Sequence, residues 1–179
     1  MDKRISQTNI QVKNDMYKAL LHLIGEKPFS SISISDITSE AGVSRMAFYR
    51  NYDTIEGILT EHLEQIVEKY KNEDLEENDA SSERVFYDKK YMIHCFSFFY
   101  AHHKFIDALI TAGMGDLFLA KITEYLIQKW IAPDTETSEE ILMVSAYAGS
   151  IYNMYRVWSK NGFVELSEDV AEILYNFRK

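Results

Sequence analysis

The sequence predicts an all-α protein. A three-helix head at the N-terminus, containing a helix-turn-helix, is followed by a larger helical body, with about nine helices in all. Three observations predict this class. Apolar residues recur at helical spacings of three and four along most of the chain. The chain has only two Pro and seven Gly among 179 residues, and few segments alternate as strands do. Ser33–Tyr52 (SISDITSEAGVSRMAFYRNY) places two short helical patterns on either side of Gly42, which is the order of a helix-turn-helix.

The composition is that of a globular protein with a substantial core, because 46% of the residues are apolar. The single cysteine, Cys95, excludes an internal disulfide and is typical of a reducing compartment. No apolar run approaches the roughly 18 residues of a membrane span, and the N-terminal stretch lacks the apolar segment of a signal peptide. We therefore expect a cytoplasmic protein without a membrane partner.

The net charge of −9 comes from the part of the chain after residue 60. Residues 1–60 contain seven Lys/Arg and seven Asp/Glu, whereas residues 61–179 contain twelve and twenty-one. Because salt screens a charge within about 10 Å, the local balance governs a DNA-facing surface more than the total does. The neutral head is compatible with DNA binding, and the acidic body limits non-specific contact with DNA.

The first two helices of the head have clear ends. A helix is expected over residues 6–26 and stops before Pro28, which lacks the amide hydrogen of a continuing helix. Ser33 or Ser35 is expected to cap the second helix, since a serine hydroxyl accepts hydrogen bonds from the first free amides. This helix is short and ends at Ala41.

The second half of the motif is a turn followed by a recognition helix. Gly42 supplies the tight turn, and Ser44 caps a helix over Arg45–Asn51. The start of such a helix faces the base edges, where Arg bonds guanine and Ala or Tyr contacts the thymine methyl group. Serines at helix starts and polar residues at the end of the recognition helix suit phosphates. The candidate DNA-binding residues are Ser33, Ser35, Ser44, Arg45, Met46, Ala47, Tyr49, Arg50 and Asn51.

The chain is expected to divide after the recognition helix. We predict a helix-turn-helix DNA-binding domain over residues 1–53 and a helical ligand-binding and dimerisation domain over residues 54–179. Asp53 or Thr54 caps the fourth helix. The acidic segment 72–83 is a further candidate seam between domains.

The body is predicted to consist of helices rich in aromatic residues. Aromatic side chains crowd residues 84–105, which implies burial on several sides. Gly113 marks a helix junction, and another helix follows over about 116–130. Ser138, followed by Glu140 and an apolar run, is expected to cap the next helix.

The last two predicted helices carry apolar residues in alternate steps of three and four, the spacing of a seam that packs against another helix. This seam packs either inside the subunit or across a dimer. We favour the dimer, because two-fold DNA sites are read by two-fold proteins. The predicted dimer residues are Ile141, Val144, Ala148, Ile151, Tyr155, Trp158, Val170, Ile173 and Phe177. A second stripe, expected to face the subunit's own body, consists of Met143, Tyr147 and Met154.

The aromatic body also contains candidates for a small-molecule site. Apolar side chains with a few polar ends are the usual lining of such a pocket, although aromatic clusters are more often plain core. The candidate ligand-binding residues are Cys95, Phe99, His102, Phe118, Tyr125, Tyr147 and Met154.

Neither metal binding nor catalysis is predicted. His94 and Cys95 are adjacent and diverge on a helix, and His102 is too far from His94 for one compact site. The sequence contains no Cys-x-x-Cys or His-x-x-x-His pair, no Gly-rich phosphate loop and no nucleophile elbow. We expect no metal, no other cofactor and no enzymatic activity.

A set of residues across the motif matches a known family pattern. The set is Ile34, Asp36, Ile37, Ala41, Gly42, Val43, Ser44, Phe48, Tyr49, Tyr52, Glu56 and Leu59. With these residues, the segment 32–59 resembles the DNA-binding head of the tetracycline-repressor (TetR/AcrR) family of bacterial regulators. The preceding stretch ALLHLIGEKPFSSISI is similar to that family's first helix and the entry to its second. SAYAGSIYNMYRVWSKNG is similar to its dimer-forming helices.

The resemblance implies an all-helical homodimer whose two heads read a palindromic DNA operator. It implies a transcriptional regulator that acts as a repressor. It also implies an unidentified small-molecule effector, bound in the body, that changes the spacing of the heads and releases the protein from DNA.

Two positions depart from the family pattern. Ile55 stands where the family often has Lys, and Asp53 where it often has a basic residue. Each lost phosphate contact weakens binding and lowers its salt dependence by roughly one unit of slope. Either Lys3 and Arg4 compensate as an N-terminal arm, or the chain is a TetR-like protein with a weakened DNA grip. In that alternative it acts as a co-activator or protein-binding module.

Overall fold

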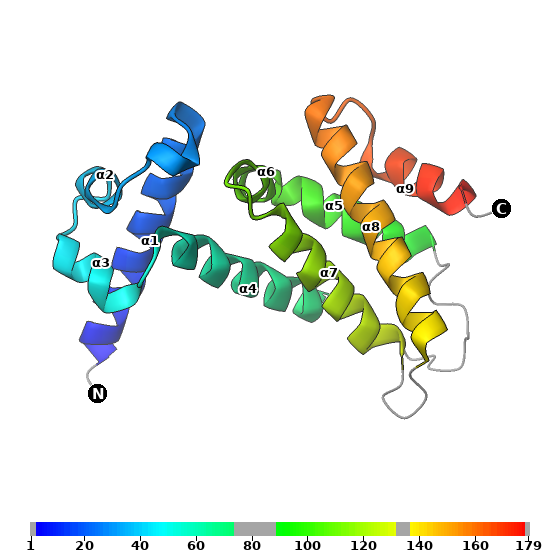
Figure 1. Ribbon diagram of the computed structural model, residues 1–179, viewed down its shortest axis with the longest axis horizontal. Coiled ribbons are helices and arrows are strands. Elements are labelled where there is room, and N and C mark those ends of the chain that lie inside the picture. Colours follow the sequence, from blue (N-terminus) through cyan, green and yellow to red (C-terminus); the bar gives the residue numbers. More distant parts are fainter. Residues whose placement is uncertain (1–2, 74–88, 132–136, 178–179) are drawn as a thin grey trace. The chain divides into compact units, whose positions relative to one another are not determined.

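The computed structural model describes residues 3–73, 89–131 and 137–177, and all regular structure in these ranges is helical. The predicted all-α class is confirmed, and no described helix has the length and apolar character to cross a membrane. The predicted seam at 72–83 falls mostly outside the described residues. The helices (Figure 1) are α1 (Lys3–Glu26), a short 3-10 helix (Phe29–Ser31), α2 (Ile34–Glu40), α3 (Arg45–Asn51), α4 (Ile55–Glu73), α5 (Lys89–Ala101), α6 (His103–Thr111), α7 (Gly115–Trp130), α8 (Ser138–Lys160) and α9 (Ser167–Asn176).

Contacts divide the chain into two compact units. What we call the head unit comprises Met1–Asn72 and Ala108–Met114, and the body unit comprises Glu73–Asp107 and Gly115–Lys179. The contacts therefore group α4 with the three head helices. The functional boundary predicted after residue 53 stays a prediction.

The body unit has an aromatic core. In it α5 packs along α9, and α7 runs beside α8 (Figure 1). Phe96, Phe99, Phe118, Tyr155 and Trp158 are at most 6% exposed. Their rings meet edge to face, as between Phe99 and Tyr155 with centroids 5.6 Å apart at 88°. Aromatic quadrupoles favour this arrangement, so these rings fill the core with specific geometry.

Tyr155, the one tyrosine among these five aromatic residues, has a hydrogen-bond partner for its hydroxyl. The Tyr155 hydroxyl donates to Asp107 Oδ1 at 2.8 Å, and Ser159 Oγ donates to the same oxygen at 2.7 Å. Burial, followed by the bond to Asp107, raises the pKa of Tyr155. The phenol therefore stays neutral and tethers Asp107 to α8.

The start of α8 differs from the prediction by one residue. Thr137, rather than Ser138, is the N-cap: its hydroxyl accepts from the Glu140 amide at 3.2 Å. In return the Glu140 carboxylate accepts from the Thr137 amide at 3.0 Å. A capping box needs the acidic residue three positions after the cap, and Thr137 has that spacing to Glu140 whereas Ser138 does not.

Replacing Thr137 and replacing Ser138 are expected to change the free energy of unfolding by different amounts. Thr137→Ala should lower the free energy of unfolding by about 1 kcal/mol, because it removes the cap. Ser138→Ala should change it by less than about 0.5 kcal/mol, as expected for an exposed side chain. Urea denaturation followed by circular dichroism measures both, and equal losses would contradict Thr137 as the cap.

The predicted dimer seam mostly faces inward, because six of its nine residues are buried in the single chain, and its role in a dimer stays a prediction. Those six, each at most 4% exposed in the single chain, are Val144, Ala148, Ile151, Tyr155, Trp158 and Val170. Side chains already buried in their own subunit have no surface left for a second copy. Helical spacing predicts burial but does not say what covers the stripe. Ile141 is half-buried, whereas Ile173 and Phe177 are 56% and 83% exposed.

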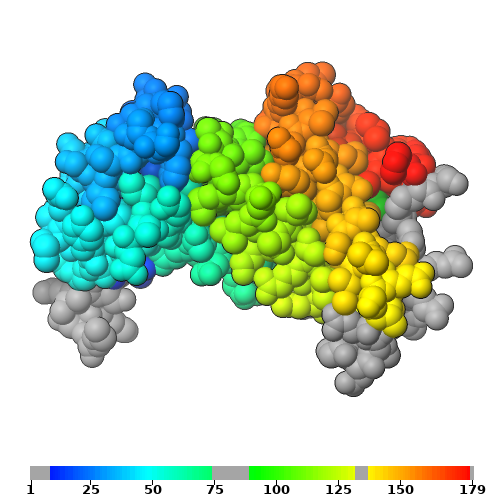
Figure 2. All heavy atoms as spheres, viewed as in Figure 1, coloured from blue at the N-terminus to red at the C-terminus, as the bar shows by residue number. Residues whose placement is uncertain are grey.

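A different face of α8 exposes apolar side chains, with the polar Asn153 among them. Leu142 and Val157 are 70% and 61% exposed, and Ala146 between them is also exposed. A Cβ built on Gly149 would meet no other atom within 4 Å. Figure 2 shows α8, from yellow to orange, along the visible side of the body unit. The stripe predicted to face the body is exposed at Met143 and half-buried at Tyr147 and Met154.

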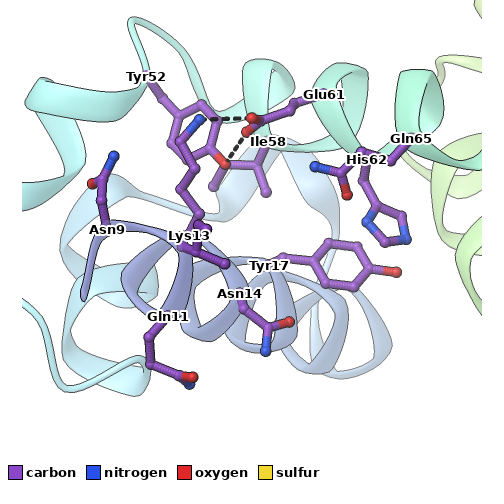
Figure 3. Close-up of a pocket in the computed structure, with 11 residues that line it drawn as sticks. Asn9, Gln11, Lys13, Asn14, Tyr17, Tyr52, Ile58, Glu61, His62 and Gln65 are labelled. Atoms are coloured by element: carbon purple, nitrogen blue, oxygen red, sulfur yellow. Dashed lines mark hydrogen bonds and ion pairs between the residues drawn. The ribbon is translucent and has the colours of Figure 1, made fainter. Parts of the chain in front are cut away.

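The head unit is built around apolar side chains from α1 to α4. Leu20, Ile37, Phe48, Leu59 and Leu63 are fully buried. Burying a side chain of this size contributes about 1.5–3 kcal/mol. On a neighbouring face, α1 and α4 meet through the Lys13–Glu61 pair and the stacked rings of Tyr17 and His62 (Figure 3). These contacts hold α3 on a framework made by the other three helices.

Candidate nucleic-acid interface

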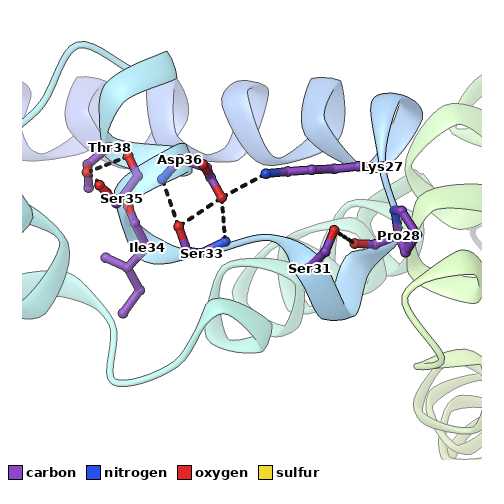
Figure 4. Close-up of polar contacts among 8 residues, drawn as sticks. All are labelled: Lys27, Pro28, Ser31, Ser33, Ile34, Ser35, Asp36 and Thr38. Atoms are coloured by element: carbon purple, nitrogen blue, oxygen red, sulfur yellow. Dashed lines mark hydrogen bonds and ion pairs between the residues drawn. The ribbon is translucent and has the colours of Figure 1, made fainter.

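The helix-turn-helix begins with a capping box at the start of α2 (Figure 4). Ser33 Oγ accepts from the Asp36 amide at 3.2 Å, and the Asp36 carboxylate accepts from the Ser33 amide at 2.8 Å. Of the two predicted caps, Ser33 is therefore the one used. Ser35 is exposed in the first turn of α2, so both serines remain at the surface of the head.

Asp36 is also held by the residue that follows α1. Lys27 Nζ donates to Asp36 Oδ2 at 2.8 Å (Figure 4). The hydrogen bond from Lys27, followed by those from Ser33, lowers the pKa of Asp36 from 3.8 to about 2. The ion pair ties the start of α2 to the end of α1.

This lowered pKa makes the stability of the head depend on pH. The contribution of Asp36 is fully present above its ordinary pKa of 3.8 and is lost as the pH falls through about 2. We expect Asp36→Asn to make the melting temperature fall less steeply from about pH 4 to about pH 2. Calorimetry at a series of pH values measures this slope. An unchanged slope, with Asp53→Asn as the exposed control, would contradict the role of the pair.

The turn and the start of α3 are set by local contacts. Gly42 has a φ of +65°, which glycine adopts without the Cβ clash of other residues. The Val43 amide donates to the Thr38 carbonyl at 2.9 Å. Ser44 Oγ accepts from the Ala47 amide at 3.1 Å, which confirms Ser44 as the predicted cap. The second helix of the motif therefore starts at a defined position and angle.

The recognition helix α3 has a buried side and an exposed side. Phe48 is fully buried, with its ring centroid 5.6 Å from that of Tyr49 and 6.0 Å from that of Tyr52. Met46 and Tyr49 are 71% and 49% exposed, and Arg45 is exposed beside them. Arg45 Nη2 donates a long hydrogen bond to the Tyr49 hydroxyl at 3.5 Å. One surface thus offers a guanidinium, a phenol and a thioether together.

The structure brings the predicted DNA-binding residues to the helix starts and to α3. Those exposed are Ser33, Ser35, Ser44, Arg45, Met46, Tyr49 and Arg50. Ala47 and Asn51 are half-buried, and Asn51 Nδ2 donates to the Ala47 carbonyl at 2.8 Å. This bond occupies one donor of the amide that was expected to approach phosphate.

The positive charge of this surface is small. The two arginines of α3 are followed by the exposed carboxylate of Asp53, and Ile55 is half-buried. The cations expected to compensate are Lys3 and Arg4, whose side chains lie outside the described residues. With few fixed cations, the grip on phosphate depends on how well α3 is positioned.

Three side chains outside the predicted set meet beside α3 (Figure 3). Lys13 of α1, Glu61 of α4 and Tyr52, the C-cap of α3, form a closed triangle. Lys13 Nζ lies 2.6 Å from Glu61 Oε1, and the Tyr52 hydroxyl donates to Glu61 Oε2 at 2.5 Å. Lys13 Nζ also lies 5.4 Å from the Tyr52 ring centroid. No sequence signal links Lys13 to a residue 48 positions away.

The predicted ligand-binding residues fall into separate contacts of the body unit. Phe99 and Phe118 are buried with ring centroids 5.3 Å apart, and so belong to the aromatic core. The ring of Tyr147 lies 5.5 Å from that of Trp130. The half-buried members of the set are Cys95, His102, Tyr125, Tyr147 and Met154. A pocket shared by all seven stays a prediction, and the described residues bring no three His, Cys, Asp or Glu together for a metal ion.

Comparison with known proteins agrees with the motif. Residues 17–61 match the model described as bacterial regulatory proteins, tetR family. The chain is 27% identical over 113 residues to the HTH-type transcriptional regulator EthR of Mycobacterium tuberculosis and to that of Mycobacterium bovis. The match covers 62% of this chain and 52% of theirs, so the chain spans about half the length of these relatives.

The fold extends the likeness beyond the head. The fatty acid degradation regulator FadR from Bacillus halodurans has a similar structure, with a TM-score of 0.59 and 14% sequence identity. The match covers 92% of this chain and 93% of that one. At this identity the likeness shows a shared fold alone.

A capped helix-turn-helix that exposes one side of its second helix places the protein among the helix-turn-helix proteins. The matched segment runs from α1 into α4 and contains the whole motif. Through this head, the chain resembles the tetR family of bacterial regulatory proteins, as the sequence pattern predicted.

Proposed function

We propose that this protein is a cytoplasmic DNA-binding regulator that binds a palindromic operator as a homodimer and represses transcription until a small-molecule effector releases it. The exposed side of α3 carries the proposal. Arg45, Met46 and Tyr49 face outward from a helix that Phe48 fixes from behind. A recognition helix must present side chains to base edges while its opposite side is buried, and α3 meets both requirements.

Arg45 and Tyr49 supply the direct reading of bases in this proposal. A guanidinium bonds O6 and N7 of guanine in the major groove, and an aromatic ring packs on a thymine methyl group. Their 3.5 Å contact presents the two groups side by side. Arg50 and the serines at the helix starts contact phosphates, which orient the head without reading sequence.

The second copy is proposed to bind through the exposed apolar face of α8 and the exposed end of α9. Large apolar side chains in water are characteristic of interfaces. Ala146 and Gly149, in the middle of the α8 face, are small enough for two helices to approach closely. The apolar residues of this surface are Leu142, Met143, Val157, Ile173 and Phe177. This face replaces the inward seam as the dimer candidate.

The effector site is proposed to lie in the body unit, around the half-buried members of the predicted ligand set. Cys95, His102, Tyr125, Tyr147 and Met154 combine apolar bodies with polar ends, which suits a small amphipathic molecule. Phe99 and Phe118 belong to the aromatic core of the same unit. The chemistry of these side chains favours a largely apolar effector with a polar group.

A mobility-shift titration with the DNA beside the protein's own gene tests the function. Specific DNA binding has dissociation constants of roughly 10⁻⁸–10⁻¹¹ M at physiological salt. We expect a shift in this range that persists with excess random competitor DNA. A folded dimer that gives no specific shift even at low salt would contradict the proposal.

A second candidate function rests on the exposed carboxylate of Asp53, which follows α3 and repels phosphate. In this alternative the protein is a TetR-like module with a weakened DNA grip, and it acts as a co-activator or binds a protein. It predicts only salt-sensitive binding without sequence preference. Under the first proposal, Asp53→Lys strengthens an operator shift that the unchanged protein already gives.

A further inference from the structure

A groove of about 380 Å³ lies between α1 and α4 in the head unit (Figure 3). Its lining includes the Lys13–Glu61–Tyr52 triangle. Farther along, the rings of Tyr17 and His62 stack with centroids 3.8 Å apart at 21°. In Figure 3 the side chains of Lys13 and Tyr52 converge on Glu61 from two different elements. One carboxylate therefore joins three parts of the head.

We propose that Glu61 is a positioning residue for DNA recognition. By accepting hydrogen bonds from Tyr52 and Lys13 at once, it locks the C-terminal end of α3 to α1 and α4. We call this contact the head clamp. The inference rests on the proposed DNA-binding function and adds to it the device that fixes the angle of the reading surface.

The end of α3 depends on such a device because the helix is short. α3 has seven residues, too few for a helix to be stable alone. Its start is fixed by the Ser44 cap and its middle by Phe48. At its end, the Tyr52 amide donates to the Phe48 carbonyl at 2.9 Å, and the Tyr52 hydroxyl reaches Glu61. Without the hydroxyl bond, the packing of the buried Tyr52 ring against Phe48 is left to hold this end of α3.

The protonation states of the head clamp favour strong bonds. Burial opposes the charge on Glu61, but hydrogen bonds from Lys13 and then Tyr52 outweigh it, and the pKa of Glu61 is lowered. Burial, followed by the bond to Glu61, raises the pKa of Tyr52. At neutral pH a carboxylate therefore accepts from an ammonium and from a neutral phenol. Charge-assisted hydrogen bonds of this kind are shorter and stronger than neutral ones.

The geometry also separates the role of Lys13 from that of a phosphate-binding lysine. Its ammonium lies 2.6 Å from Glu61 and 5.4 Å from the Tyr52 ring centroid, so its charge is paired within the head, although 31% of the side chain is exposed. A lysine that contacts phosphate instead adds about one unit to the salt slope of DNA binding. The head clamp predicts that Lys13→Gln weakens operator binding without lowering this slope.

The test uses two conservative variants of the full chain, Tyr52→Phe and Glu61→Gln. Tyr52→Phe removes only the hydroxyl, so the buried ring and the fold are retained. We expect each variant to bind operator DNA roughly ten-fold more weakly, the effect of losing one charged hydrogen bond. Binding to random DNA stays unchanged. In the free protein, amide hydrogen exchange rises over residues 45–52 and stays unchanged in α2.

The matched control is Glu172→Gln, which breaks the Lys89–Glu172 ion pair of 3.0 Å in the body unit. It is expected to change neither measurement. Both changes break the same contact, so their effects on operator affinity should not add. The double variant Tyr52→Phe/Glu61→Gln should therefore bind operator as tightly as the single variant with the lower affinity. Fully additive losses would overturn the proposal.

Hydrogen exchange keeps this proposal separate from the DNA-binding function. If exchange in α3 is unchanged in both variants, the head clamp is overturned, whether or not the unchanged protein binds an operator. If exchange rises as expected but the unchanged protein binds no operator, the head clamp is present and the proposed function is overturned. Equal losses for operator and random DNA would show that Glu61 does not position the reading surface.

Discussion

Replacing Arg45 and Tyr49 together by Ala is expected to reduce affinity for the operator to that for random DNA. Specific binding exceeds non-specific binding by roughly 10³-fold or more, and each good base contact contributes about 1–3 kcal/mol. Both side chains are exposed on α3, so their removal leaves the head core intact. Fluorescence anisotropy with labelled operator and random duplexes measures the two affinities.

Two further variants separate base contacts from phosphate contacts. Arg50→Ala, which removes a proposed phosphate contact, should weaken binding to both duplexes alike and lower the salt slope by about one. Lys104→Ala removes an exposed cation of the body unit and should change neither. If specific binding survives the double variant Arg45→Ala/Tyr49→Ala, α3 does not read the bases in the way proposed.

Placing Glu at both Leu142 and Val157 is expected to convert the proposed homodimer into a folded monomer. These side chains are 70% and 61% exposed in the single chain, so the charges cost little in a monomer. Across the proposed interface they would be buried without partners, at a cost of several kcal/mol per charge. Analytical ultracentrifugation measures the change. Because a monomer reads a single half-site, operator affinity should fall with it.

The inward stripe of α8 gives the contrasting control. Val144→Glu places a charge in a fully buried position, and we expect it to unfold the body unit rather than to give a folded monomer. Ile10→Glu, at a position 64% exposed in the head unit, should leave the dimer intact. A dimer that tolerates both charges at Leu142 and Val157 would show that the second copy binds elsewhere.

The sequence predicted the helix-turn-helix well because its signals are local. Ser44 caps the amide three residues on, and Gly42 takes the φ of +65° that its turn requires. Both depend on residues within one helical turn. The predicted bounds of the recognition helix, Arg45–Asn51, are those of the structure. The family match over residues 17–61 covers the same region.

The sequence predicted contacts between residues far apart in the chain less well. The stripe through Val144, Ile151 and Trp158 has the spacing of any packed helix, and its spacing alone does not distinguish the chain's own core from a second copy. Lys13 and Glu61 meet because α1 and α4 pack together, which no local pattern records. Where long-range packing decides the outcome, local sequence patterns leave more than one alternative open.

Selection from a random DNA pool tests the central claim most directly, because it needs no assumption about the operator. The protein is incubated with random duplexes, and bound sequences are amplified over several rounds. The exposed side of α3 and a two-fold dimer predict a palindromic motif, with half-sites about one helical turn or a multiple of it apart. They also predict that Arg45→Ala loses preference at one base pair of each half-site. A folded dimer that enriches no motif would contradict the account.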